Sequence, residues 1–131
     1  MTDRTDAIAA LGRNVWVIPE GYIPTGSTGD GRAFESHETA CILNTGDEDA
    51  SVEVTLFFTD REPVGPYRVT VRARRTIHLR FNDLEDPEPV QRDTDYASVI
   101  VSDVPIVVQH TRLDSRQAEL ALLSTMAFPA G

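Results

Sequence analysis

Short apolar stretches alternate with polar turns along the chain, and this pattern predicts strands rather than helices. In residues 51–58, Val52, Val54, Leu56 and Phe58 would share one face of an extended chain, with the intervening residues on the other. Further strands are predicted at residues 14–18, 36–44, 67–72, 77–81 and 96–102, and from residue 104 onward. The chain is therefore expected to be built mainly of β-structure.

The last apolar stretch, residues 118–128, fits either a helix or a strand. Its Ala and Leu content favours a helix, whereas its place after so many strands favours a closing strand, which is the interpretation adopted. About eight short strands separated by Gly- and Pro-containing turns are typical of a β-sandwich. The sequence thus predicts an all-β, antiparallel, jelly-roll-like β-sandwich with little helix.

Turn-forming residues divide these strands and set the expected domain limits. Residues 1–12 are interpreted as a flexible leader with one short helical turn, and residues 13–131 as a single domain. The Gly-rich segment 25–32 is interpreted as a flexible loop, because it lacks the Lys and the following helix of a phosphate cradle. Turns or loops are also predicted at residues 19–24, 60–66 and 103–105, and a long acidic surface loop at residues 82–94.

Composition narrows the class of protein. With 131 residues, 40% hydrophobic and 25% charged, the chain is an ordinary globular domain. A net charge of −9 argues against broad nucleic-acid binding, so an anionic partner would need a local basic patch. The polar N-terminus and the lack of a long apolar run predict a cytoplasmic protein without membrane insertion. Cys41, the one cysteine, lies in an apolar run and is expected to be buried and inert.

Charged residues alternate at the end of the apolar run that begins at residue 104. His110, Arg112, Asp114 and Arg116 would stand on one face of an extended chain. Such a set forms either a structural ion-pair network or a recognition site. A subunit interface is a third setting in which paired charges of this kind are found.

A second charged face is expected from the strands at 67–72 and 77–81. If these strands pair as a hairpin, Arg68, Arg72, His78 and Arg80 form a basic outer face. Like charges on neighbouring strands must be offset, by the acids of residues 82–95, a partner subunit or an anionic ligand. They could equally be solvated charges on an exposed face.

No pattern of catalytic residues emerges. Ser36, His37 and Glu38 cannot form a relay, because adjacent strand residues point to opposite faces. His37 and His110, with Glu38 or Asp114, could hold a metal ion if the fold brought them together, but isolated histidines are more often structural. We therefore expect a protein that is not an enzyme and carries no metal or cofactor.

Several segments resemble the sensory rhodopsin transducer family, in particular its soluble Anabaena type. These segments are residues 20–24, 36–44, 62–68, 73–76, 80–84 and 105–118, the last being the most specific, and the resemblance extends from about Gly12 to Phe128. The resemblance implies a small cytoplasmic β-sandwich that assembles as a homotetramer. Such a protein would bind the cytoplasmic side of a seven-helix sensory rhodopsin and relay its light signal.

Three non-enzymatic functions follow from the residues and the resemblance together. A transducer could dock through its acidic loop, at Asp83, Glu85 and Asp86, because cytoplasmic loops of membrane proteins are usually rich in Lys and Arg. The family's fold is also similar to carbohydrate-binding sandwiches, and members have been considered as DNA-associated regulators. A carbohydrate or other small ligand would be bound by Trp16, Tyr22, His37 and Glu38. DNA would be bound by the basic face.

Overall fold

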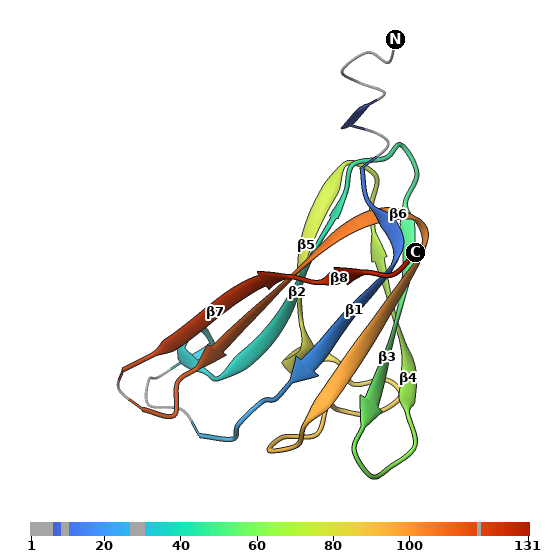
Figure 1. The fold of residues 1–131 in the computed structure, drawn as a ribbon. Helices are drawn as coiled ribbons and strands as arrows, with labels where there is room; N and C mark the ends of the chain where they lie inside the picture. Colours follow the sequence, from blue (N-terminus) through green and yellow to red (C-terminus); the bar gives the residue numbers. More distant parts are fainter. Residues whose placement is uncertain (1–6, 9–10, 27–30, 118) are drawn as a thin grey trace.

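The computed structural model describes residues 7–8, 11–26, 31–117 and 119–131. These residues form eight antiparallel strands arranged in two packed layers (Figure 1), so the predicted β-sandwich is confirmed. The strands are β1 (Arg13–Gly21), β2 (His37–Asn44), β3 (Ala50–Phe58), β4 (Val64–Val71), β5 (Arg75–Arg80), β6 (Tyr96–Asp114), β7 (Ala121–Met126) and β8 (Phe128–Pro129). Two short 3-10 turns are added, η1 (Arg32–Phe34) and η2 (Phe81–Asp83).

The long strand β6 belongs to both layers. Its first half pairs with β1 and β3, and its second half with β2 and β7. Sheet A therefore has the order β8-β1-β6-β3-β4, and sheet B the order β5-β2-β6-β7. In Figure 1, β6 rises along β1 and then bends across the sandwich to run beside β7.

The predicted tight turn at residues 103–105 is wrong, because β6 stays extended through Pro105. The ladder with β1 is irregular there: Val15 pairs with Val101, but Arg13 pairs with Ile106. Proline has no backbone N–H and is tolerated in a strand at such irregularities. The proline therefore marks the point where β6 passes from sheet A to sheet B, rather than a reversal of the chain.

The core fills the space between the two sheets. Sheet A contributes Val54 and Ile100, and sheet B contributes Ile42 and Val108; all four side chains are fully buried. Their spacing along each strand follows the two-residue period of an extended chain. The alternation in residues 51–58 thus gave the correct inward face of β3, where Val52, Val54 and Leu56 are buried.

The predicted hairpin between residues 67–72 and 77–81 is not formed. Strand β4 pairs with β3 in sheet A, and β5 pairs with β2 in sheet B. Arg74, with a φ of 54°, lies in the connection that carries the chain from one sheet to the other. Arg68 and Arg72 are therefore separated from His78 and Arg80, and these four residues do not form one basic face.

Two predicted turns are shorter than expected. Strand β1 continues through Pro19 to Gly21, and β4 begins at Val64, inside the predicted loop 60–66. Pro66 is compatible with a strand because β4 lies at the edge of sheet A. The prolines in both segments favoured turns in the sequence, but these parts of the chain pair with neighbouring strands in the structure.

The remaining predictions concern the two ends of the chain and the Gly-rich loop. The strand interpretation of residues 118–128 is confirmed by β7 and β8. Ala7 and Ile8 are helical, and the Thr45 hydroxyl donates a hydrogen bond to the Ile8 carbonyl oxygen at 2.5 Å. The rest of the predicted leader turn and most of the Gly-rich loop fall on residues 1–6, 9–10 and 27–30, which lie outside the described residues.

Candidate functional site

A buried carboxylate, Glu38, joins the two central strands of sheet B. Its side chain is fully buried and lies opposite Arg112 in the β2–β6 ladder. His110 Nε2 lies 2.5 Å from Glu38 Oε1, and Arg112 donates from Nε at 3.3 Å and from Nη2 at 3.2 Å. The backbone N–H of Tyr22 also donates to Glu38, and Arg112 Nη1 donates to Glu20 at 3.3 Å. Glu20, Glu38, His110 and Arg112 are called the Glu38 cluster below.

The charges and hydrogen bonds of the Glu38 cluster indicate a structural role. Burial alone would lower the pKa of Arg112, but hydrogen bonds to Glu38 and Glu20 outweigh it and the pKa is raised. Burial, followed by the charge of Glu38, raises the pKa of Tyr96 well above its usual value. The Tyr96 hydroxyl is buried without a hydrogen-bond partner among the described residues. A carboxylate held by this many donors connects strands and has no free oxygen for a ligand.

The four alternating charged residues of the 104–117 segment take part in two separate sets of contacts. His110 and Arg112 belong to the Glu38 cluster, whereas Asp114 pairs with Arg116 across a 2.6 Å contact at the end of β6. The hydrogen bond from Arg116 is the main cause that lowers the pKa of Asp114. The Arg116 guanidinium also lies 5.9 Å from the centre of the Tyr22 ring.

The structure does not bring the residues predicted to bind a carbohydrate together on one surface. Trp16 is buried, and its indole N–H donates to the carbonyl oxygens of Arg13 at 3.0 Å and Ile106 at 2.9 Å. Glu38 is enclosed in its cluster. His37 lies on the outer face of sheet B, where its Nδ1 donates to the Glu35 carbonyl oxygen at 2.7 Å.

A metal site from His37 and His110 is not formed either. The two histidines lie on opposite faces of sheet B, because His110 faces the Glu38 cluster and His37 faces outward. Within the described part of the chain, no group of three or more His, Cys, Asp or Glu side chains is placed to hold a metal ion.

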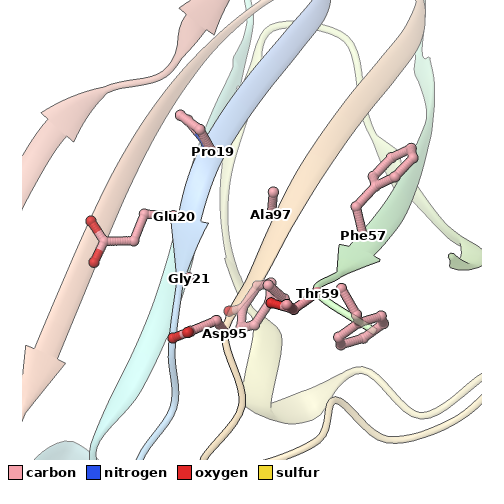
Figure 2. A pocket seen from close by; sticks show the side chains of 9 residues that line it. Pro19, Glu20, Gly21, Phe57, Thr59, Asp95 and Ala97 are labelled. Atoms are coloured by element: carbon pink, nitrogen blue, oxygen red, sulfur yellow. The ribbon is translucent and has the colours of Figure 1, made fainter. Parts of the chain in front are cut away.

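A shallow hollow on the outer face of sheet A is shown in Figure 2. Phe57 lies opposite Ala97 in the β3–β6 ladder, and Figure 2 shows Pro19 of β1 on the other side of Ala97. In this row the small Ala97 leaves space between its larger neighbours. The hollow has a volume of about 460 Å³. Asp95 and Thr59 lie at the end of the row, where β3 ends and β6 begins. The hollow is therefore lined by apolar rings together with a few oxygen atoms.

The outer face of sheet B carries a second hollow, which we call the sheet B groove. It has a volume of about 430 Å³ and collects basic, hydroxyl and thiol side chains from η1, β2, β5 and β6. The lining residues are Arg32, His37, Thr39, Cys41, His78, Arg80 and Thr111. Cys41 was predicted to be buried, but it points to this outer face and is half-exposed, opposite His78 in the β2–β5 ladder.

The remaining predicted residues are spread over the surface. Arg68 and Arg72 are exposed, and Arg68 Nε lies 3.5 Å from Glu53 across the β3–β4 ladder. In the acidic loop, Asp83 forms a two-pronged ion pair with Arg32, and this hydrogen bonding is the main cause that lowers the pKa of Asp83. Glu85 and Asp86, the other two predicted docking residues, are exposed.

Sequence reasoning missed Glu20, Arg32 and Tyr96. Glu20 belongs to the Glu38 cluster, and Tyr96 adjoins it, only because β1, β2 and β6 converge there. Arg32 meets Asp83 across 51 residues of sequence. These contacts depend on which strands pair, and the alternation pattern contains no information about pairing.

No helix in the described residues is long and apolar enough to cross a membrane. The family model of the Anabaena sensory rhodopsin transducer matches residues 11–129. The chain is 63% identical to a solved structure of the Anabaena sensory rhodopsin transducer, over 78% of this chain and 99% of the other, with a TM-score of 0.70. It is 34% identical to a crystal structure of Thermotoga maritima 1070, over 91% and 96% of the two chains, with a TM-score of 0.81.

A comparison with curated protein sequences finds no match. The match to the family model spans nearly the whole sandwich, from β1 to β8, and includes every strand that carries the Glu38 cluster and the sheet B groove. The family is one of signal transducers rather than a known enzyme family. This chain therefore belongs to the Anabaena sensory rhodopsin transducer family.

Proposed function

We propose that the protein is a cytoplasmic, non-enzymatic transducer that binds a seven-helix sensory rhodopsin and relays its light signal. The observation that carries the proposal is the family match over residues 11–129, together with 63% identity to the Anabaena transducer. A transducer acts through a surface whose affinity differs between two states of its receptor, and it needs no catalytic residues. The Glu38 cluster fits this role as a structural network that holds the sandwich rigid.

The acidic loop after η2 supports a docking surface. Glu85 and Asp86 are exposed, whereas Asp83 is held by Arg32 and contributes less free negative charge. Cytoplasmic loops of membrane proteins carry an excess of Lys and Arg, so complementary charge would guide the encounter. Docking should therefore depend on Glu85 and Asp86 more than on Asp83.

The test is light-dependent binding to a retinal protein from the same cell. Saturable binding that differs between dark and illuminated receptor is expected, and Glu85→Lys/Asp86→Lys should weaken it about tenfold or more at low salt. Asp47→Lys/Glu48→Lys is the matched control, because the turn between β2 and β3 lies at the opposite end of sheet B from η2. Equal binding by the wild type and the loop variant would exclude this docking surface, and an absence of any receptor binding would exclude the function.

We also propose the homotetramer that the resemblance implies. The described residues pair β7 on one side only, with β6, and β7 and the adjoining β8 expose large apolar side chains. Leu122 is 71% exposed, Met126 57% and Phe128 65%. An open edge with apolar side chains favours strand addition from another copy.

Light scattering of the purified protein tests the assembly. The wild type is expected at four times the chain mass, and Leu122→Lys/Met126→Lys is expected to reduce that mass. Leu43→Lys, on the outer face of β2 and 38% exposed, is the control. A monomeric wild type, or a tetramer unchanged by the β7 variant, would contradict this interface.

A second candidate function is binding of a carbohydrate at the hollow of Figure 2. Phe57 is 43% exposed beside Ala97, and aromatic faces with nearby oxygen atoms suit sugar recognition. A sugar panel should raise the melting temperature of the wild type and leave that of Phe57→Ala unchanged. A flat response of the wild type across the panel would count against this function.

A further inference from the structure

Arg80 occupies an unusual position in the sheet B groove, because its side chain is half-buried and its charge is poorly neutralised. Its side chain is only 12% exposed. Nη2 donates to the carbonyl oxygen of Arg32 at 2.6 Å and weakly to that of Glu35 at 3.5 Å, and the Glu35 carboxylate lies 3.6 Å away. Nε is buried and has no hydrogen-bond partner among the described residues. A buried Nε–H without an acceptor and a half-buried guanidinium whose carboxylate is 3.6 Å away are both unfavourable, and an anion in the groove would offset that cost.

The neighbouring arginine adds to this imbalance rather than relieving it. Burial first, and then the nearby charge of Arg32, lower the pKa of Arg80, against the opposing effects of Glu35 and Asp83. The carboxylate of Asp83 is engaged by both prongs of the Arg32 guanidinium. The groove therefore holds two guanidinium groups. Arg32 forms a bidentate ion pair with Asp83, whereas Arg80 has only the longer, 3.6 Å contact with Glu35.

The other lining groups are suited to a compact anion. His37 and His78 offer imidazole nitrogens, and Thr39 and Thr111 offer hydroxyl groups. A tetrahedral phosphate accepts hydrogen bonds in several directions, and the paired N–H groups of an arginine guanidinium can donate to two of its oxygens at once. A volume of about 430 Å³ is within the range of small-molecule sites. A nucleic acid fits less well, because the net charge of −9 repels an extended polyanion.

We propose that the sheet B groove binds a small metabolite through a phosphate monoester group, with Arg80 as the principal contact. The ligand site lies on the outer face of β2, β5 and β6; it meets the acidic loop at the Arg32–Asp83 ion pair and does not include Glu85 or Asp86. The inference therefore does not depend on the existence of a rhodopsin partner. Its failure and that of the transducer function are detected by different experiments.

Calorimetric titration of the full-length protein with inorganic phosphate and with glycerol 3-phosphate, at constant ionic strength, tests the site. Both probes should bind saturably, and Arg80→Met should weaken them about tenfold or more, as expected for loss of a charge-assisted hydrogen bond. Arg68→Met is the matched control, because it removes the same charge from an exposed position on sheet A. His78→Asn, a change at an exposed residue, should weaken binding without unfolding the sheet.

Cys41 provides an independent report from inside the groove. It is the one cysteine of the chain, so its reaction with neutral iodoacetamide is read without interference from other thiols. Phosphate should slow this reaction in the wild type and in Arg68→Met, but not in Arg80→Met. An unchanged rate in the presence of bound phosphate would place the anion elsewhere and overturn the proposal.

Three further results would also overturn it. These are the absence of saturable phosphate binding, equal affinities of wild type and Arg80→Met, and binding of inorganic phosphate with exclusion of glycerol 3-phosphate. Circular dichroism of each variant establishes that a loss of binding is not a loss of fold.

Discussion

Arg112 and Arg80 lie on β6 and β5, the two neighbours of β2 in sheet B, yet they are in opposite electrostatic situations. Arg112 lies on the same face of sheet B as Glu38, and its guanidinium contacts two carboxylates, Glu38 at 3.2 Å and Glu20 at 3.3 Å. Arg80 faces outward, is only 12% exposed, and has its nearest carboxylate, Glu35, at 3.6 Å. The pKa of Arg112 is raised and that of Arg80 is lowered.

The difference separates a structural charge from a charge available for binding. In the Glu38 cluster every member has an oppositely charged or hydrogen-bonding neighbour, and removing Glu38 leaves His110 and Arg112 without their shared carboxylate. In the sheet B groove, removing Arg80 leaves behind carbonyl oxygens at an exposed site, where water can replace it. The two arginines should therefore respond differently to the same substitution.

The largest effect is expected from Glu38→Gln. This change leaves Arg112 and His110 without their shared carboxylate, and losing one partner of a buried pair costs about 3–5 kcal/mol. Urea unfolding measures the loss, with Glu53→Gln on the exposed face of β3 as the control, for which a loss of under about 1 kcal/mol is expected. A Glu38→Gln loss as small as that of the control would show that the cluster does not stabilise the fold.

A smaller effect of opposite sign is expected from Tyr96→Phe, beside the same cluster. The Tyr96 hydroxyl is buried without a partner among the described residues, so its removal should be neutral or stabilise the fold by up to about 1 kcal/mol. Thermal unfolding of the variant measures this change. A clear destabilisation would mean that the hydroxyl is hydrogen-bonded, for example through water, and that the cluster extends to β6 at Tyr96.

The smallest effect concerns the exposed pairs Asp83–Arg32 and Asp114–Arg116. Both aspartates have a lowered pKa in the fold, so their pairs stabilise it above about pH 4 and this contribution is lost as the pH falls further. Because both arginines are exposed to solvent, each pair contributes little to stability.

The pH dependence of unfolding of Asp83→Asn/Asp114→Asn tests these two pairs. The variant should be slightly less stable than the wild type near neutral pH and equal to it in strong acid. A difference that grows as the pH falls would contradict the assigned direction of both shifts.

The strands could be predicted because their signal is local. The alternation of Val52, Val54 and Leu56 requires only the two-residue period of a strand, and the structure places all three in the core. Pro105 misled the prediction, because proline is as compatible with the irregular middle of a long strand as with a turn.

The sites could be predicted only in part, because they depend on strand pairing. The charges at His110 and Arg112 were visible in the sequence, but their partner Glu38 is reached only through the β2–β6 ladder. The hairpin of β4 and β5 was the natural choice for consecutive strands, and it placed Arg68 and Arg80 on one face. The chain instead enters the other sheet after β4, and Arg80 joins Thr39 and Cys41 in a groove that no local pattern indicates.

The most direct test is the free energy of unfolding of Arg80→Met and Arg112→Met, each measured with and without inorganic phosphate. Arg112→Met should lose about 3–5 kcal/mol in both conditions, because Glu38 stays buried beside it. Arg80→Met should match the wild type without phosphate to within about 1 kcal/mol and should fail to gain the stabilisation that phosphate gives the wild type. Equal losses for the two variants, independent of phosphate, would show that both arginines are structural and would contradict the distinction drawn between the cluster and the groove.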